Sequence, residues 1–268
     1  MTFHWKKELF RLFHLFHLEK EYVYDKDDKK AWIFDKKILY KHILEEKLSD
    51  AYESYILGRN GDLYVWMKEN AISKSTYSIW AKYCLDCSYT DLTERNRDIS
   101  LFVKDPYGLP YIPGSSLKGA VRTALLGYKL SKNSQMGQLQ SDIRYNSRAR
   151  NRNELSKKLR GSSRILEETF HTLEREKVKK ENAVCDELSG MRISDSKPMS
   201  VKDLILCQKI DKNIDGKDRV LPIFRECLKP KTKIYFDMTI DESICNYRKE
   251  DILEAVKYFF NNTNKQYK

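Results

Sequence analysis

The sequence of 268 residues contains no apolar run of about 20 residues, the length that a membrane-spanning helix needs. Its first stretch, MTFHWKKELFRLFHLFHLEK, interrupts Phe and Leu with His, Lys and Arg and has no small-residue cleavage site. That pattern is not typical of a secretory signal peptide. With 41% hydrophobic and 33% charged residues, the composition indicates a soluble globular protein, and we expect it in the cytoplasm.

Closely spaced cysteines are also scarce. Six cysteines are present, but only Cys84 and Cys87 lie near each other, and no second close pair completes a zinc site. We therefore expect reduced, mostly buried thiols, and neither a metal nor a cofactor.

Negative charge is in deficit. The chain has 50 Lys and Arg against 39 Asp and Glu, a net charge of +11, which favours a polyanionic partner such as a nucleic acid. The basic residues gather in residues 144–164, where only Glu154 opposes them. They are Arg144, Arg148, Arg150, Arg152, Lys157, Lys158, Arg160 and Arg164. A solvated insertion with no partner explains such a run equally well, so both interpretations stay open.

Hydrophobic periodicity indicates a mixture of strands and helices. Residues 21–35 predict a hairpin around a charged turn. Residues 36–57 predict one helix whose apolar residues at helical spacing are Leu44, Leu48, Ala51, Tyr52, Tyr55 and Ile56. Residues 98–112 predict a strand, a turn and a return strand, and a helix is expected from Ser115 to about Gly127.

The second half predicts a further set of elements. Within a polar insertion at 128–190, we expect a helix over 164–180 with Phe170 on its apolar side. Strands are predicted near 191 and over 203–210, with the turn NIDGKD (213–218) after them. The strict alternation of 231–240 predicts a half-buried strand, and 249–262 an amphipathic helix with Ile252, Val256, Phe259 and Phe260 inward. Such mixed elements predict an α+β fold, an antiparallel sheet with helices on one face; a ferredoxin-like βαββαβ order is a guess.

The stretch YIPGSSLKGAVR (111–122) carries the chemistry. Gly114 allows a sharp bend, Ser115 or Ser116 can cap the helix, and free amides at its start can hold an anion. Lys118 and Arg122, four residues apart, leave one face of the helix. A capped helix with solvated cations is one interpretation. A nucleotide-binding P-loop fails, because Lys118 precedes its glycine and Ala120 offers no hydroxyl for magnesium. A seat for RNA phosphates is the third interpretation and suits the composition best.

The same stretch resembles the RAMP superfamily of CRISPR effector subunits, whose members join a strand to a helix through PGSSLKG. Within that superfamily, residues 99–126, 191–211 and 221–240 together resemble the fifth subunit of the type III-A (Csm) complex. The resemblance covers roughly residues 21–260 and implies a ferredoxin-like (RRM-like) core.

This resemblance divides the chain into four parts. Residues 1–20 are a divergent N-terminal segment, 21–127 the first part of the core, 128–190 a basic helical insertion and 191–268 the second part of the core. The family's first strand with its loop, and its glycine-rich C-terminal part, have no counterpart here. We therefore expect a truncated or decayed member whose sheet lacks an edge partner.

The resemblance implies a function in antiviral defence. Such a subunit binds the 3′ portion of the crRNA without catalysis, caps the filament of the repeated backbone subunit and supports crRNA 3′-end maturation by host nucleases. The residues that match the family's RNA-binding segments are Gly114, Ser115, Ser116, Lys118, Gly119, Arg122, Arg192, Lys197 and Arg225. Tyr107 and Tyr111 are candidates to stack on bases.

A processing endoribonuclease of the same superfamily is the alternative function. Asp195, in ISDSKP, is the tempting catalytic carboxylate, but an Asp between two serines is more often part of a turn. His14, His17 and His171 have no partner in the sequence pattern that would make one of them a general base.

Overall fold

The structure is a computed structural model. It describes residues 17–18, 22–25, 27–58, 62–88, 90, 99–132, 136–146, 148, 151–158, 160, 166, 168–212 and 217–266. The chain forms two compact units, each built from two separate stretches. The first unit is Met1–Tyr111 with Pro198–Ile234, and the second is Ile112–Lys197 with Tyr235–Lys268. The predicted four-part division stays a prediction; most of the predicted turn at 213–218 and His14 lie outside the described residues.

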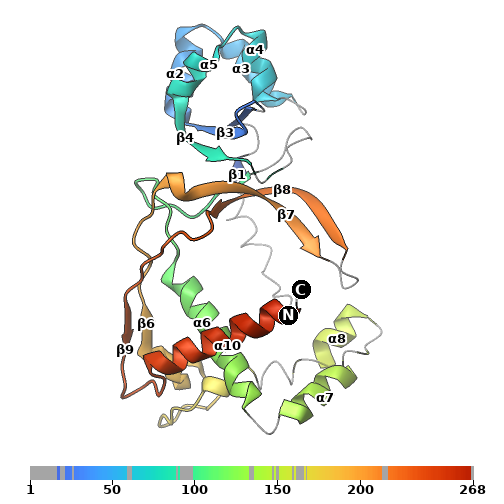
Figure 1. The fold of residues 1–268 in the computed structure, drawn as a ribbon, viewed down its shortest axis with the longest axis vertical. Coiled ribbons are helices and arrows are strands. Elements are labelled where there is room, and N and C mark those ends of the chain that lie inside the picture. Colours follow the sequence, from blue (N-terminus) through green and yellow to red (C-terminus); the bar gives the residue numbers. More distant parts are fainter. Residues whose placement is uncertain are drawn as a thin grey trace. The chain divides into compact units, whose positions relative to one another are not determined.

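Within its described residues, the first unit contains a seven-stranded sheet (Figure 1). Its strands, in spatial order, are β1 (His17–Leu18), β5 (Ile99–Ser100), β8 (Asp218–Leu228), β7 (Leu204–Lys212), β4 (Ala81–Asp86), β3 (Lys30–Phe34) and β2 (Tyr22–Asp25). The pairs β5–β8 and β4–β7 are parallel and the other neighbours are antiparallel. The hairpin predicted for residues 21–35 is confirmed as β2 and β3.

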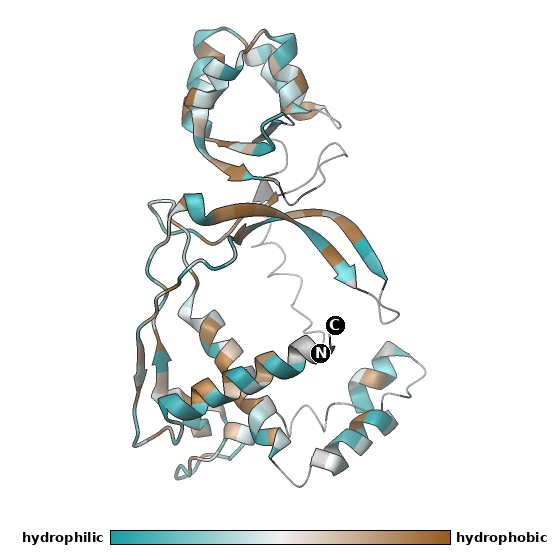
Figure 2. Ribbon diagram, viewed as in Figure 1, coloured by the Kyte–Doolittle hydropathy of each residue, from teal (hydrophilic) through white to brown (hydrophobic). Residues whose placement is uncertain are grey.

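Four helices separate β3 from β4 and lie together beside these strands (Figure 1). They are α2 (Lys36–Glu45), α3 (Ser49–Leu57), α4 (Leu63–Glu69) and α5 (Lys74–Trp80). The alternation along β3 explains this layering. Phe34 packs with the helices against Trp80, whereas Ala31 and Ile33 join a second cluster on the opposite face. Figure 2 shows apolar residues continuing along β7 and β8, where Leu206 and Phe224 complete that second cluster. The predicted α+β class is confirmed, while the ferredoxin-like order stays a prediction.

The single helix predicted over 36–57 is wrong. The helical run breaks at Glu46–Leu48, where Lys47 has φ +55°. The buried side chains of α2 and α3 therefore do not lie along one continuous helical stripe. In α2 the buried residues are Leu39 and Ile43, and Leu44 is exposed. A break of this kind lets two short amphipathic helices each turn an apolar face to one core.

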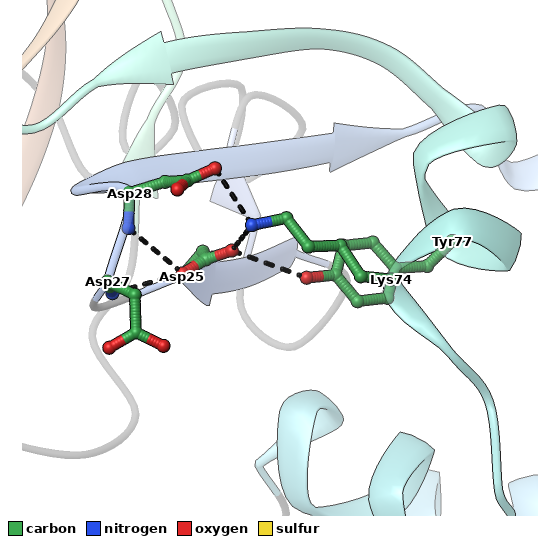
Figure 3. Close-up of polar contacts among 5 residues, drawn as sticks. All are labelled: Asp25, Asp27, Asp28, Lys74 and Tyr77. Carbon is green, nitrogen blue, oxygen red and sulfur yellow. Dashed lines mark hydrogen bonds and ion pairs between the residues drawn. The ribbon is translucent and has the colours of Figure 1, made fainter.

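A polar cluster fixes the turn between β2 and β3 against α5 (Figure 3). Oδ1 of Asp25 accepts from the amides of Asp27 and Asp28, and Oδ2 accepts from Lys74 Nζ at 2.5 Å and from the Tyr77 hydroxyl at 3.5 Å. Lys74 also donates to Asp28. Burial acts to raise the pKa of Asp25, but the bond from Lys74 and the two amides outweigh it, so the pKa lies below its usual value.

The second unit is organised around two long helices, α6 (Gly114–Ser131) and α10 (Lys249–Gln266), which pack against each other (Figure 1). Strands β6 (Met191–Ile193) and β9 (Met238–Ile240) pair antiparallel beside them. The apolar core is made of Val121, Leu125, Phe170, Leu188, Met191, Cys245, Ile252 and Ala255. Two further helices, α7 (Met136–Asn146) and α8 (Arg152–Lys158), follow α6 in the chain.

Three predictions for this unit are wrong. Residues 164, 165 and 167 lie outside the described residues, but over 168–180 the predicted helix is replaced by one 3-10 turn, η1 (Glu168–Phe170), in which Phe170 is fully buried. The strand predicted over 231–240 is confined to β9; half-buried and exposed side chains alternate over 231–237, but Met238, predicted to face inward, is exposed. In α10, Ile252 and Ala255 are buried but Val256, Phe259 and Phe260 are exposed. The buried face of α10 is therefore marked by Ile252 and Ala255, while Tyr258 contacts the ring of Tyr128 on α6 from a more exposed position.

Among the described residues, no helix is long and apolar enough to span a membrane. All six cysteines are free thiols: three are buried, two are half-buried and only Cys84 is exposed. No group of three or more His, Cys, Asp or Glu side chains in the described part of the chain is arranged to hold a metal ion.

Candidate nucleic-acid interface

The predicted motif lies along the segment that follows β6, and we call residues 112–122 with 191–197 the β6–α6 junction. The amide of Ser196 donates to the carbonyl of Ile112 at 2.9 Å, and the amide of Ile112 donates to Ser196 Oγ at 2.9 Å. Ser196 is itself buried. This reciprocal pair fixes the start of α6 against the chain that leaves β6.

Gly114 is required at this junction because of space. A Cβ atom there would lie 2.3 Å from the carbonyl oxygen of Ile193 and 2.4 Å from that of Ser194. Gly114 does not need a positive φ. Among the described glycines the one with a positive φ, +82°, is Gly108 in the DPYG turn. Gly114 therefore allows two backbones to touch.

The predicted serine cap is wrong, because a carboxylate from another segment takes that place. The helix begins at Gly114, one residue earlier than expected, and the amide of Gly114 donates to Asp195 Oδ1 at 2.8 Å. The amides of Ser116 and Leu117 donate to the carbonyl of Pro113. Of these first amides, only that of Ser115 has no acceptor among the described residues. The side chains of Ser115 and Ser116 are exposed on the first turn.

Both predicted cations of α6 have partners inside the second unit. Lys118 Nζ donates to the carbonyl of Met191 at 2.7 Å. The Arg122 guanidinium forms an ion pair with Asp186 and lies over the ring of Phe170, 4.8 Å from its centroid. Asp186 also accepts from the amide of Leu188 at 2.8 Å. These contacts connect α6 to the start of β6 and to the chain before it, and sequence analysis identified neither acceptor.

Gly119 and Arg192 are open to solvent at the same junction. A Cβ atom added to Gly119 would meet nothing within 4 Å. Arg192 is exposed and lies between the two points where β6 contacts α6, the Met191 carbonyl at Lys118 and the Ile193 carbonyl at Gly114. The Arg192 backbone thus lies beside the first turns of the helix, and its exposed side chain acts on Asp241.

The Lys197 side chain, at the end of this segment, is also exposed. Its amide donates to the carbonyl of Tyr235 at 2.9 Å, and the Tyr235 side chain is 60% exposed. Tyr235 is therefore an aromatic candidate that the sequence analysis missed; Tyr107, which it suggested, belongs to the first unit. Arg225 also belongs to the first unit, where it is exposed on β8 opposite Cys207, so it is not part of the junction.

Carboxylates accompany these cations. Asp195, Asp237 and Asp241 are all exposed near the junction. Hydrogen bonds from Ser243 hold the pKa of Asp241 below its usual value, and the charge of Arg192 adds to the effect. The junction is therefore a mixed polar surface in which Arg192 and Lys197 are the exposed cations and Ser115, Ser116 and Gly119 supply small groups.

The side chains considered for catalysis have other surroundings. Asp195 accepts the first amide of α6, as described above. His171 is buried beside Phe170, and its Nδ1 has no hydrogen-bond partner among the described residues. Neither arrangement joins a base to a nucleophile.

Comparison with known proteins agrees with this fold. The RAMP superfamily model matches residues 53–268, most of the chain. A curated relative, "CRISPR system Cms protein Csm5" of Streptococcus thermophilus, is 28% identical over 82% of this chain and 57% of its own length. Another protein of the same name, from Mycobacterium tuberculosis, is 34% identical over 54% of this chain and 36% of its own length.

Among solved structures, the crystal structure of T. onnurineus Csm5 matches with a TM-score of 0.69 and 19% identity, covering 93% of this chain and 76% of that one. At that identity the match concerns the fold. The chain spans about half or less of the length of the curated relatives it matches. The chain therefore belongs to the RAMP superfamily, and its curated relatives within that superfamily are Csm5 proteins.

Proposed function

We propose that this chain is a non-catalytic RNA-binding subunit of a type III-A CRISPR effector complex. In this proposal it binds the 3′ portion of the crRNA, contacts the repeated backbone subunit at the end of its filament and supports 3′-end maturation by host nucleases in the cytoplasm. The family membership and the Csm5 relatives support the place in the complex. The net charge of +11 supports an RNA partner.

One observation carries the RNA-binding part: the first turns of α6 are open where the motif predicts contact. Ser115, Ser116 and Gly119 are exposed, and Gly119 presents bare backbone with free space around it. An RNA phosphate can approach such a surface closely and accept hydrogen bonds from an amide and hydroxyl groups. Arg192 adds an exposed positive charge beside it.

The predicted RNA-binding residues then divide into two roles. Lys118, Arg122 and Gly114 hold the junction together, because their contacts are internal to the second unit. Arg192 and Lys197 have exposed side chains and meet phosphates in our proposal, together with Ser115, Ser116 and Gly119. Arg225 is a separate contact from the first unit.

The test measures binding of the full chain to labelled single-stranded RNA at several salt concentrations. Replacing both Arg192 and Lys197 by Ala removes two phosphate contacts. The negative slope of log K against log salt therefore becomes less steep, by about 1.4 in magnitude. The matched control is Lys37→Ala with Lys41→Ala, two exposed cations on α2. An equal change in both double variants would contradict the proposed site.

The same protein distinguishes binding from cleavage. Incubation with a labelled crRNA precursor, with and without EDTA, leaves the RNA intact if the chain only binds. Site-specific products would support the endoribonuclease instead.

A further inference from the structure

The described side chains of helices α7 and α8 take no part in the apolar core of the second unit. Every α7 side chain that the structure describes is exposed, and in α8 only Glu154 and Leu155 are half-buried. No described residue of either helix belongs to a hydrophobic core cluster. Most helical stability in proteins comes from packing an apolar face, so the described residues of these two helices gain little from their own unit.

Their surface is strongly positive. Residues 136–160 contain seven basic residues and two acidic ones, Asp142 and Glu154. The Glu154 carboxylate forms an ion pair with Lys158 at 2.8 Å. The side chains of Arg148, Lys157 and Arg160 are exposed and have no acidic partner within the described part of the chain. Their charge is therefore available to a polyanion.

An exposed aromatic ring lies among these charges. Tyr145, near the end of α7, is 72% exposed, and the turn that follows brings the Arg148 amide to the Tyr145 carbonyl at 3.3 Å. Tyr145 also lies close enough to Lys158 to act on its pKa, which is raised chiefly by the hydrogen bond to Glu154 and less by Tyr145. The exposed ring of Tyr145 thus lies among the cations of residues 144–160.

A recess of about 510 Å³ opens beside α8 and is lined by Asn151, Asn153, Glu154 and Lys157. The Asn151 side chain caps the helix, accepting from the Glu154 amide at 2.9 Å. Asn153 is exposed and has both an amide donor and an acceptor, the groups that read the edge of an unpaired base.

We propose that Tyr145, Arg148, Asn153, Lys157 and Arg160 form a second RNA-binding surface on α7 and α8, separate from the β6–α6 junction. It binds a single-stranded segment: the cations contact phosphates, and a base stacks on Tyr145. This inference rests on the proposed RNA-binding function and extends it to the basic run for which the sequence offered two interpretations.

A single strand fits this surface better than a duplex or a protein. The ring of Tyr145 can stack only on a base that is not already stacked within a helix. A protein partner generally needs a fully buried apolar centre, and the described apolar surface here is small, with Ile143 37% exposed. Cations interleaved with an aromatic ring are typical of sites that follow a single-stranded backbone.

The test compares RNA affinity and its salt dependence for full-length variants. The triple variant Arg148→Ala, Lys157→Ala and Arg160→Ala is expected to show a shallower salt dependence. The magnitude of the negative slope of log K against log salt falls by about 2. Tyr145→Ala is expected to weaken binding about tenfold, whereas Tyr145→Phe, which keeps the ring, binds like the wild type. The matched control replaces three exposed lysines of the first unit, Lys37, Lys41 and Lys68, by Ala. Alanine favours helix, so α7 and α8 persist in the triple variant, and circular dichroism checks this.

The outcomes separate this inference from the proposed function. If the wild-type chain binds no RNA, the proposed function fails and this inference fails with it. If the wild type binds and the α7–α8 triple variant matches the wild type, only this inference is overturned. A triple variant that binds RNA normally but no longer co-purifies with another subunit would identify a protein surface and also overturn it.

Discussion

The main-chain amide of Gly114 donates a hydrogen bond of 2.8 Å to the carboxylate of Asp195. This bond gives a structural role to the residue that most resembles a catalytic acid in the sequence. It also places a negative charge at the end of the helix where a phosphate was expected, so any phosphate there must avoid Asp195 and approach from the side of Ser115 and Gly119.

The first prediction concerns Asp195. Asp195→Ala removes the acceptor for the Gly114 amide and lowers the free energy of unfolding by about 1 kcal/mol. Asp195→Asn keeps an acceptor and costs less. Because both changes remove a negative charge near the proposed phosphate site, both variants bind RNA as tightly as the wild type or more tightly. Denaturant unfolding and RNA titration measure the two effects. If the wild type cleaved RNA and Asp195→Asn did not, Asp195 would have a catalytic role in addition to capping α6.

The second prediction uses the two glycines of the motif as a matched pair. Gly114→Ala drives Cβ into two backbone carbonyls and destabilises the second unit by about 3 kcal/mol or more. Gly119→Ala meets open space and improves helix propensity, so it raises stability by about 1 kcal/mol. RNA binding nevertheless weakens in Gly119→Ala if a phosphate contacts the backbone there. A stable Gly119→Ala variant with unchanged RNA affinity would remove Gly119 from the RNA surface.

The motif could be located from the sequence because its local signals are strong. Gly114 followed by an amphipathic run predicts a strand-to-helix turn whatever surrounds it, and α6 begins within one residue of the expected position. The partners of its side chains could not be predicted. Asp195 lies 81 residues from Gly114 and Asp186 lies 64 residues from Arg122, and no local pattern connects them.

The same distinction explains the wrong elements. The alternation is real over 231–237, but this chain forms no named strand: the carbonyls of Tyr235 and Asp237 accept from the amides of Lys197 and Ser194, and the Asp237 amide donates to Ser194 Oγ. The sequence analysis did not assign β8, whose buried Glu226 breaks the apolar pattern. Glu226 is tolerated because the Tyr83 hydroxyl, the Phe102 amide and Lys104 all donate to it. The three donors come from two segments distant in sequence from Glu226, so composition cannot indicate that this buried charge is satisfied.

The third prediction concerns Arg122 and Asp186. Arg122→Ala leaves the Asp186 carboxylate, 16% exposed, without its cation and uncovers the ring of Phe170. We expect a loss of about 1–2 kcal/mol in the free energy of unfolding. Asp186→Asn costs a similar amount, and the double variant costs less than the sum of the two because they share one interaction. Thermal or denaturant unfolding of the four proteins completes the cycle; additive costs would show that the pair contributes nothing to stability.

The internal contacts of Lys118 and Arg122 also affect how RNA-binding data on the motif are interpreted. A variant that replaces Lys118 and Arg122 by Ala loses internal contacts of the second unit, so weaker RNA binding follows from partial unfolding alone. Arg192 and Lys197 avoid this difficulty, since their exposed side chains have no hydrogen bond to the described core. Their double variant is therefore expected to unfold at the wild-type denaturant concentration while binding RNA more weakly.

The last prediction is a pH dependence that originates at Asp25 (Figure 3). Its pKa is lowered in the folded chain, so its contribution to stability is present above the unfolded value, about 3.9, and is lost as the pH falls through the folded value. The wild type therefore loses stability below about pH 4. Asp25→Asn lowers the free energy of unfolding at pH 7, because the bond with Lys74 loses its charge, but the stability of this variant changes less as the pH falls from 6.

Urea unfolding of both proteins across this range provides the measurement. The control is Asp27→Asn, because the Asp27 side chain is exposed and only its amide contacts Asp25. Parallel loss of stability in the wild type and in Asp25→Asn would show that other carboxylates cause the acid sensitivity.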